Sequence, residues 1–161
     1  MSRESDTGDH PPDPLDLLEG ARAARTAPAA SEAAILAALH LAPDDLAVRM
    51  GAYKFYFYNA RLAEALPHAA WTIAHAAHAL ALPEDWRQVE PGSAAFDTLE
   101  EGPRLFLQSL LAWGYCKARL GDLTEGIEAM ERVAALDPHD RFGAARLADV
   151  VRRQGHDEEE G

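Results

Sequence analysis

Apolar residues recur at intervals of three and four along most of the chain, the spacing that places side chains on one face of an α-helix. Proline, glycine and aspartate interrupt this pattern at short intervals, which is typical of helices joined by tight turns. The pattern therefore predicts an all-α protein with about seven helices. These helices are expected over 14–25, 30–41, 45–59, 63–82, 103–120, 124–136 and 140–154.

The chain is expected to form one helical domain, 13–155, between two polar ends. Residues 1–12 contain almost nothing apolar and are predicted to be a disordered leader, while 156–161 is predicted to be a solvated acidic tail. Within the domain, segment 83–102 is interrupted by two prolines and two glycines. We predict a loop there, with room for one short turn of helix.

The window 107–140 contains a specific helix–turn–helix pattern. Leu110, Trp113, Gly114 and Lys117 occupy the first helix, Gly126 and Met130 the second, and Pro138 follows it. Glycine at 114 and 126 would let the two helices approach closely, while Trp113 and Met130 would fill the remaining space. Gly121 and Asp122 are expected to make the turn between the helices.

The spacing of the turns supports a repeat of 34 residues. Gly155 follows Gly121 by 34, and Ala60 follows Thr26 by the same step. Gly155 is therefore predicted to end the first helix of a further, capping unit. Between Ala60 and Gly121 the spacing is 61 residues, one period plus 27, and segment 83–102 accounts for the difference.

With this pattern and period, the chain resembles the tetratricopeptide repeat (TPR) family over most of 14–154. The resemblance implies a right-handed α-solenoid of antiparallel helix pairs, with about three repeats and an insertion after the middle one. Arg49 and Tyr53 depart from it, because the family prefers a large apolar and a small residue at these positions.

The resemblance also implies a concave groove lined by the first helix of each pair. The positions that it assigns to a partner-binding groove are Met50, Lys54, Phe57, Tyr58, Gln108, Leu111, Tyr115, Arg119, Arg152 and Arg153, with Phe142, Ala145 and Asp149 beside them in the cap. Cations among tyrosines can hold a carboxylate while the rings cover apolar groups. We expect an acidic segment or chain terminus of another protein there. The alternative is that the arginines are solvated residues that favour helix C-termini.

Composition narrows the classes of partner and location. The formal net charge of −12 argues against nucleic acid and anionic membranes, which bind to basic surfaces. No run of about 18 uncharged apolar residues predicts a membrane span, and the first residues lack the apolar core of a signal peptide. Cys116 is the only cysteine, and the chain is rich in alanine and arginine. We therefore expect a cytoplasmic, bacterial protein.

No residue pattern predicts catalysis or a cofactor. Phosphate-loop, dinucleotide, nucleophile-elbow and C-x-x-C motifs are missing from the sequence, and Cys116 is expected to be a small core residue. Two alternatives to partner binding stay open. His68, His75 and His78 fall on one side of a helix and are weak candidates for metal binding or regulation. The aromatic run 53–58 is an alternative surface for self-association into a homo-oligomer.

Overall fold

The computed structural model describes residues 28–160, and their secondary structure is helical throughout, without a strand in this range. The all-α prediction is confirmed for this part of the chain. No helix within the described range is long and apolar enough to cross a membrane. The predicted helix 14–25 and the leader 1–12 lie outside it. The sequence predicted one domain over 13–155, whereas the structure divides after Gly51 into two compact units.

In the first unit, α3 (Pro28–Leu41) is followed by the beginning of α4 (Leu46–Tyr58). Asp45 stands immediately before α4, and its Oδ1 accepts a hydrogen bond from the backbone N–H of Val48 at 3.1 Å. This carboxylate thus satisfies one of the amides that every helix start leaves without a partner. Because helix α4 continues past Gly51, its last seven residues belong to the second unit.

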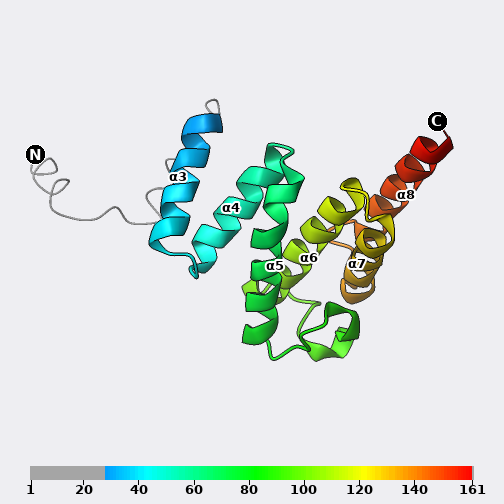
Figure 1. Cartoon of the computed structure of the whole chain (residues 1–161). Helices are drawn as coiled ribbons and strands as arrows, with labels where there is room; N and C mark the ends of the chain where they lie inside the picture. The colour runs from blue at the N-terminus through cyan, green and yellow to red at the C-terminus, as the bar shows by residue number, and fades with distance from the viewer. Residues whose placement is uncertain (1–27, 161) are drawn as a thin grey trace, which may run out of the picture. The chain divides into compact units, whose positions relative to one another are not determined.

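The second unit contains the end of α4 and four longer helices. These are α5 (Leu62–Ala79), α6 (Glu101–Arg119), α7 (Leu123–Leu136) and α8 (Ala144–Glu160). Helix α6 packs against α5 and α7, and α8 packs against α7 (Figure 1). One core cluster joins α6, α7 and α8 around Met130 and Val151, and another joins Tyr56, Ala65 and Cys116.

Two of the turns share one backbone geometry, as the repeat predicts. After α4, the N–H of Arg61 bonds the carbonyl of Tyr56 at 2.8 Å, and Ala60 has a φ of +58°. After α6, the N–H of Asp122 bonds the carbonyl of Lys117 at 2.9 Å, and Gly121 has a φ of +111°. Both are Schellman turns, in which a left-handed residue ends the helix. The 34-residue spacing therefore identified helix ends at both positions.

Replacing Ala60 with glycine is expected to stabilise the protein. Alanine pays a steric penalty at positive φ that glycine does not, so Ala60→Gly should raise the free energy of unfolding by about 0.5 kcal/mol despite glycine's greater freedom when unfolded. The matched control is Ala70→Gly, at an exposed position inside α5, which should lower it by about 1 kcal/mol. Urea unfolding would measure both, and a loss of stability in both variants would contradict the prediction.

Helices α6 and α7 pack closely through the two glycines that the sequence singled out. A Cβ at Gly114 would lie 2.9 Å from the carbonyl oxygen of Gly126, and one at Gly126 would lie 2.5 Å from the carbonyl oxygen of Gly114. Met130 is fully buried beside them. The predicted close approach is confirmed. Trp113 is different, because it is only half-buried and packs edge-on against Trp86 at 5.9 Å.

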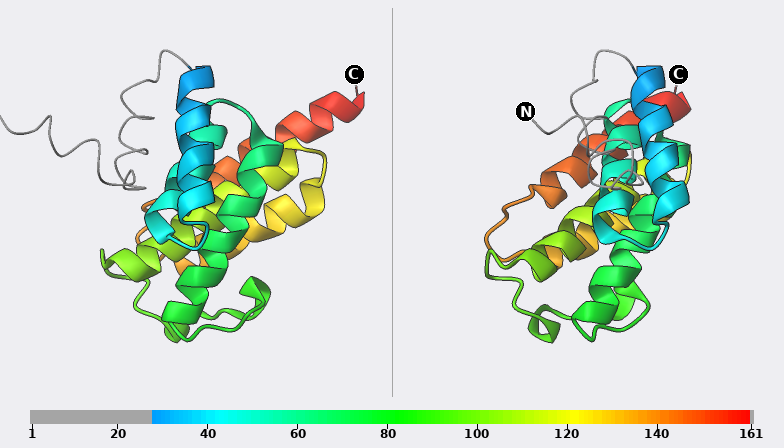
Figure 2. Two further views of the ribbon diagram at one scale, coloured as in Figure 1. Left: turned by 60° about the vertical axis from the view of Figure 1, so that its left-hand side comes forward. Right: turned by 90° about the vertical axis from the view of Figure 1, so that its left-hand side faces the viewer.

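The segment between α5 and α6 folds back against the helices. It contains two short 3₁₀ helices, η1 (Trp86–Gln88) and η2 (Pro91–Ser93), one more turn than predicted (Figure 2). Arg87 in η1 forms ion pairs with Glu125 at 2.5 Å and Glu128 at 3.0 Å, both on α7. Arg141 donates to the backbone carbonyls of Asp97 and Thr98. The insertion is therefore part of the packed structure of the second unit.

The last predicted helix is wrong at both ends. Helix α8 begins at Ala144 instead of 140, because Asp140 and Gly143 take positive φ values that a helix cannot contain. It continues to Glu160, so Gly155 lies inside the helix and does not form the predicted turn. A Cβ at Gly155 would lie 2.7 Å from Leu123 Cδ2. This glycine therefore allows α8 to approach the start of α7.

Candidate functional site

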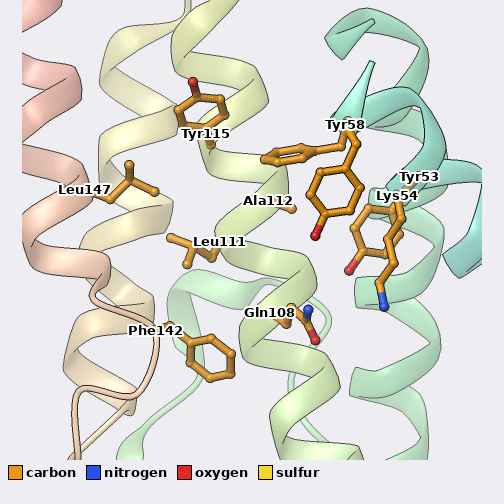
Figure 3. A pocket seen from close by; sticks show the side chains of 10 residues that line it. Tyr53, Lys54, Tyr58, Gln108, Leu111, Ala112, Tyr115, Phe142 and Leu147 are labelled. Carbon is orange, nitrogen blue, oxygen red and sulfur yellow. The ribbon is translucent and has the colours of Figure 1, made fainter. Parts of the chain in front are cut away.

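The second unit contains a cavity of about 310 Å³ between the end of α4, the middle of α6 and the beginning of α8 (Figure 3). Ten residues line it: Tyr53, Lys54, Phe57, Tyr58, Gln108, Leu111, Ala112, Tyr115, Phe142 and Leu147. This volume is at the lower end of the range of about 300–1,000 Å³ that is usual for ligand pockets. It suits one anchoring group better than a long segment.

Helical periodicity explains why these side chains meet. On α6, Gln108, Leu111, Ala112 and Tyr115 follow the i, i+3, i+4, i+7 spacing of a single face. The lining residues of α4 form two pairs one turn apart, 53–54 and 57–58. The opposite face of α6 is fixed against α7 by Gly114. The cavity is thus presented by helices whose backs are packed.

Tyr53 is the most deeply buried polar residue of the cavity. Its side chain is only 3% exposed, and its hydroxyl has no hydrogen-bond partner among the described residues. Burial, with a smaller contribution from Tyr58, raises the pKa of Tyr53 to about 12. The hydroxyl is therefore a neutral donor at physiological pH.

The rest of the aromatic run divides between core and surface. Tyr56 is buried with Ala65 and Cys116, whereas Tyr58 is 75% exposed. Phe57 contacts Tyr115 across the cavity, with ring centroids 5.6 Å apart. Burial also raises the pKa of the Cys116 thiol to about 11, which suits the predicted role as a small core residue.

Six of the ten predicted groove positions line this cavity. They are Lys54, Phe57, Tyr58, Gln108, Leu111 and Tyr115, and Phe142 from the predicted cap joins them. The list missed Tyr53, Ala112 and Leu147. The departure of Tyr53 from the repeat pattern was the available signal, because a large ring in a slot for a small residue must project out of the helix contact.

The other four predicted positions are not brought to the cavity. Met50 belongs to the first unit. Arg119 donates to the side chain of Gln154 at 3.1 Å. Arg152 pairs with Asp149 at 2.8 Å and with Glu131 at 3.5 Å, and Arg153 is exposed. The basic character predicted for the groove therefore comes down to Lys54 among the residues that line the cavity.

The three histidines of α5 do not converge on a common point. His68 stacks on Tyr56 with ring centroids 6.0 Å apart, and His75 stacks on Trp71 at 5.0 Å. Within residues 28–160, no group of three or more His, Cys, Asp or Glu side chains is placed to hold a metal ion. The structure thus gives the histidine stripe aromatic neighbours.

Fold and cavity together define an all-helical protein with a half-open, partly apolar pocket. The chain is 37% identical over 123 residues to an uncharacterized 19.8 kDa protein in the nifW 5′ region of Azotobacter chroococcum mcd 1, a match that covers 75% of this chain and 69% of that protein. The chain belongs to the family of that protein. No family model matches the chain, and no solved structure matches it.

Proposed function

We propose that this protein is a TPR-like α-solenoid that binds a segment of another protein in the α4–α6–α8 cavity, without catalysing a reaction. The observation that supports the proposal is the coincidence of two independent placements. The repeat register assigned six positions to a binding groove, and the same six line the cavity. A repeat scaffold with a pocket on the first-helix side is suited to an adaptor or chaperone-like role.

The lining favours a partner with apolar and acceptor groups. Leu111, Phe142 and Leu147 offer apolar surface, while Lys54, Gln108 and Tyr53 carry hydrogen-bond donors. No carboxylate is among the ten lining residues, although the chain as a whole carries a net charge of −12. The local chemistry therefore supports an acidic partner segment.

The alternatives have less support. A histidine metal site would need ligands directed at one point, and His68 and His75 stack on different rings. Self-association through the aromatic run would rest on Tyr58, since Tyr53 and Tyr56 are buried. The name of the Azotobacter relative places it in the 5′ region of nifW. The nifW product is for that reason the first candidate partner to test.

Reversing the charge at Lys54 should abolish partner capture. With immobilised protein and cell extract or purified nifW product, Lys54→Glu is expected to reduce the captured partner at least about tenfold, because it places a carboxylate beside the partner's acceptor groups. The matched control is Arg104→Glu on an exposed part of α6, which changes the net charge equally outside the cavity. Equal capture by both variants would sink the proposal.

A further inference from the structure

The hydroxyl of Tyr53 is a donor without a described acceptor. Buried hydroxyl groups in folded proteins nearly always have a hydrogen-bond partner, because burial removes the water that would otherwise bond them. This one is 97% buried, and no acceptor among the described residues reaches it. It lines the cavity and is directed into it (Figure 3). The cavity therefore contains a binding group that its own walls do not satisfy.

The two sides of the cavity differ in chemistry. The polar ends of Tyr53, Lys54 and Gln108 lie on the α4 side, whereas Leu111, Phe142 and Leu147 lie on the α8 side (Figure 3). A ligand that fills the cavity must present an acceptor to the first side and an apolar group to the second. In about 310 Å³, these two groups must be close neighbours in one small unit.

The charge of the lining favours an anionic acceptor over a neutral one. Lys54 is the only charged residue among the ten that line the cavity. Tyr53 does not compete as an anion, because burial raises its pKa to about 12 and keeps the hydroxyl protonated. A hydrogen bond from a neutral hydroxyl to a carboxylate is stronger than one to a neutral carbonyl, and a nearby ammonium strengthens the preference.

We propose that the cavity binds the C-terminal residue of the partner, with the terminal carboxylate on Tyr53 and Lys54 and an apolar side chain against Leu111 and Leu147. This inference rests on the proposed function and names its ligand. A terminal residue carries a carboxylate and a side chain on the same Cα. An internal aspartate or glutamate has a carboxylate but no apolar branch for the α8 side. The amide of Gln108 can accept the N–H of the terminal residue.

Three small probes test the proposal on the full chain by NMR titration or calorimetry at millimolar concentrations. They are N-acetyl-alanyl-leucine with a free carboxylate, the same peptide as its C-terminal amide, and 4-methylpentanoate. The free-carboxylate peptide should bind at least about tenfold more tightly than the amide, because the charge-assisted hydrogen bonds are lost in the amide. It should also exceed 4-methylpentanoate, which lacks the N–H for Gln108.

Tyr53→Phe distinguishes recognition from a structural role. The change should weaken binding of the free-carboxylate peptide about tenfold and leave the amide within about twofold, since only the carboxylate uses the hydroxyl fully. It should not lower the melting temperature, because the removed hydroxyl has no described partner to lose. A hydroxyl with a structural role would instead lower the melting temperature.

Three outcomes would overturn the inference: no binding of the free-carboxylate peptide, equal binding of acid and amide, or binding of 4-methylpentanoate as tight as that of the peptide. The last would assign the cavity to a free organic acid. These outcomes leave the proposed function standing if Lys54→Glu still abolishes partner capture. Loss of the capture effect with intact peptide binding would have the opposite meaning.

Discussion

Gly126→Ala should destabilise the protein by at least about 2 kcal/mol, although alanine is the better helix former by about 1 kcal/mol. A Cβ at this position would lie 2.5 Å from the carbonyl oxygen of Gly114 and 2.6 Å from the backbone nitrogen of Ala118. Both are backbone atoms of α6, which cannot turn aside as a side chain can. Helices α6 and α7 must therefore separate, and the packing around Met130 is lost with them.

Gly92→Ala is the matched control, because nothing lies within 4 Å of the position that its Cβ would take. It should change the free energy of unfolding by no more than about 0.5 kcal/mol. Urea unfolding monitored by circular dichroism would measure both variants. If Gly126→Ala were as stable as Gly92→Ala, the close approach of α6 and α7 would be refuted. Loss of probe binding in Gly126→Ala alone would link this packing to the cavity.

The parts of the fold that the sequence predicted well are those fixed by local chemistry. Gly121 ends α6 because glycine tolerates positive φ, and Gly114 and Gly126 mark close packing because no larger residue fits there. Such signals depend on one or two residues and their immediate neighbours. Periodicity then recovered the described helices to within a few residues, apart from the ends of α8.

Gly155 shows where the same reasoning fails. Its spacing from Gly121 predicted a turn, but a glycine serves equally at a turn and at a close helix contact. The choice depends on Leu123, which lies 32 residues away in the sequence and contacts Gly155 in the folded chain. After Gly155 the chain contains no proline or further glycine before Gly161, so nothing local ends the helix.

The candidate site was predictable in position and less so in chemistry. Helical spacing and the repeat register placed six lining residues, because both depend only on which face of a helix a residue occupies. The arginines were expected to share the groove, but Arg119 and Arg152 bond neighbouring side chains instead. The unsatisfied hydroxyl of Tyr53 could not be foreseen, because burial and missing partners exist only in three dimensions.

Phe106→Ala should have the largest effect on stability, a loss of about 3–5 kcal/mol. Phe106 is the largest side chain among those that are fully buried, and its ring lies 6.1 Å from that of Phe96 in the insertion. Removing it leaves a void beneath α6 and removes the contact that holds Phe96. The insertion should then become accessible to a protease before the helices unfold, which limited proteolysis would detect.

The control for this effect is Leu99→Ala, in the same segment but 66% exposed, which should stay within about 0.5 kcal/mol of the parent. A loss below about 1 kcal/mol in Phe106→Ala would show that the void collapses without cost, contrary to a tightly packed core. Phe106 lies two residues before Gln108 on the same helix, and it does not line the cavity. If the insertion fixes the position of α6, Phe106→Ala should therefore also weaken binding of the free-carboxylate peptide, while Leu99→Ala leaves it unchanged.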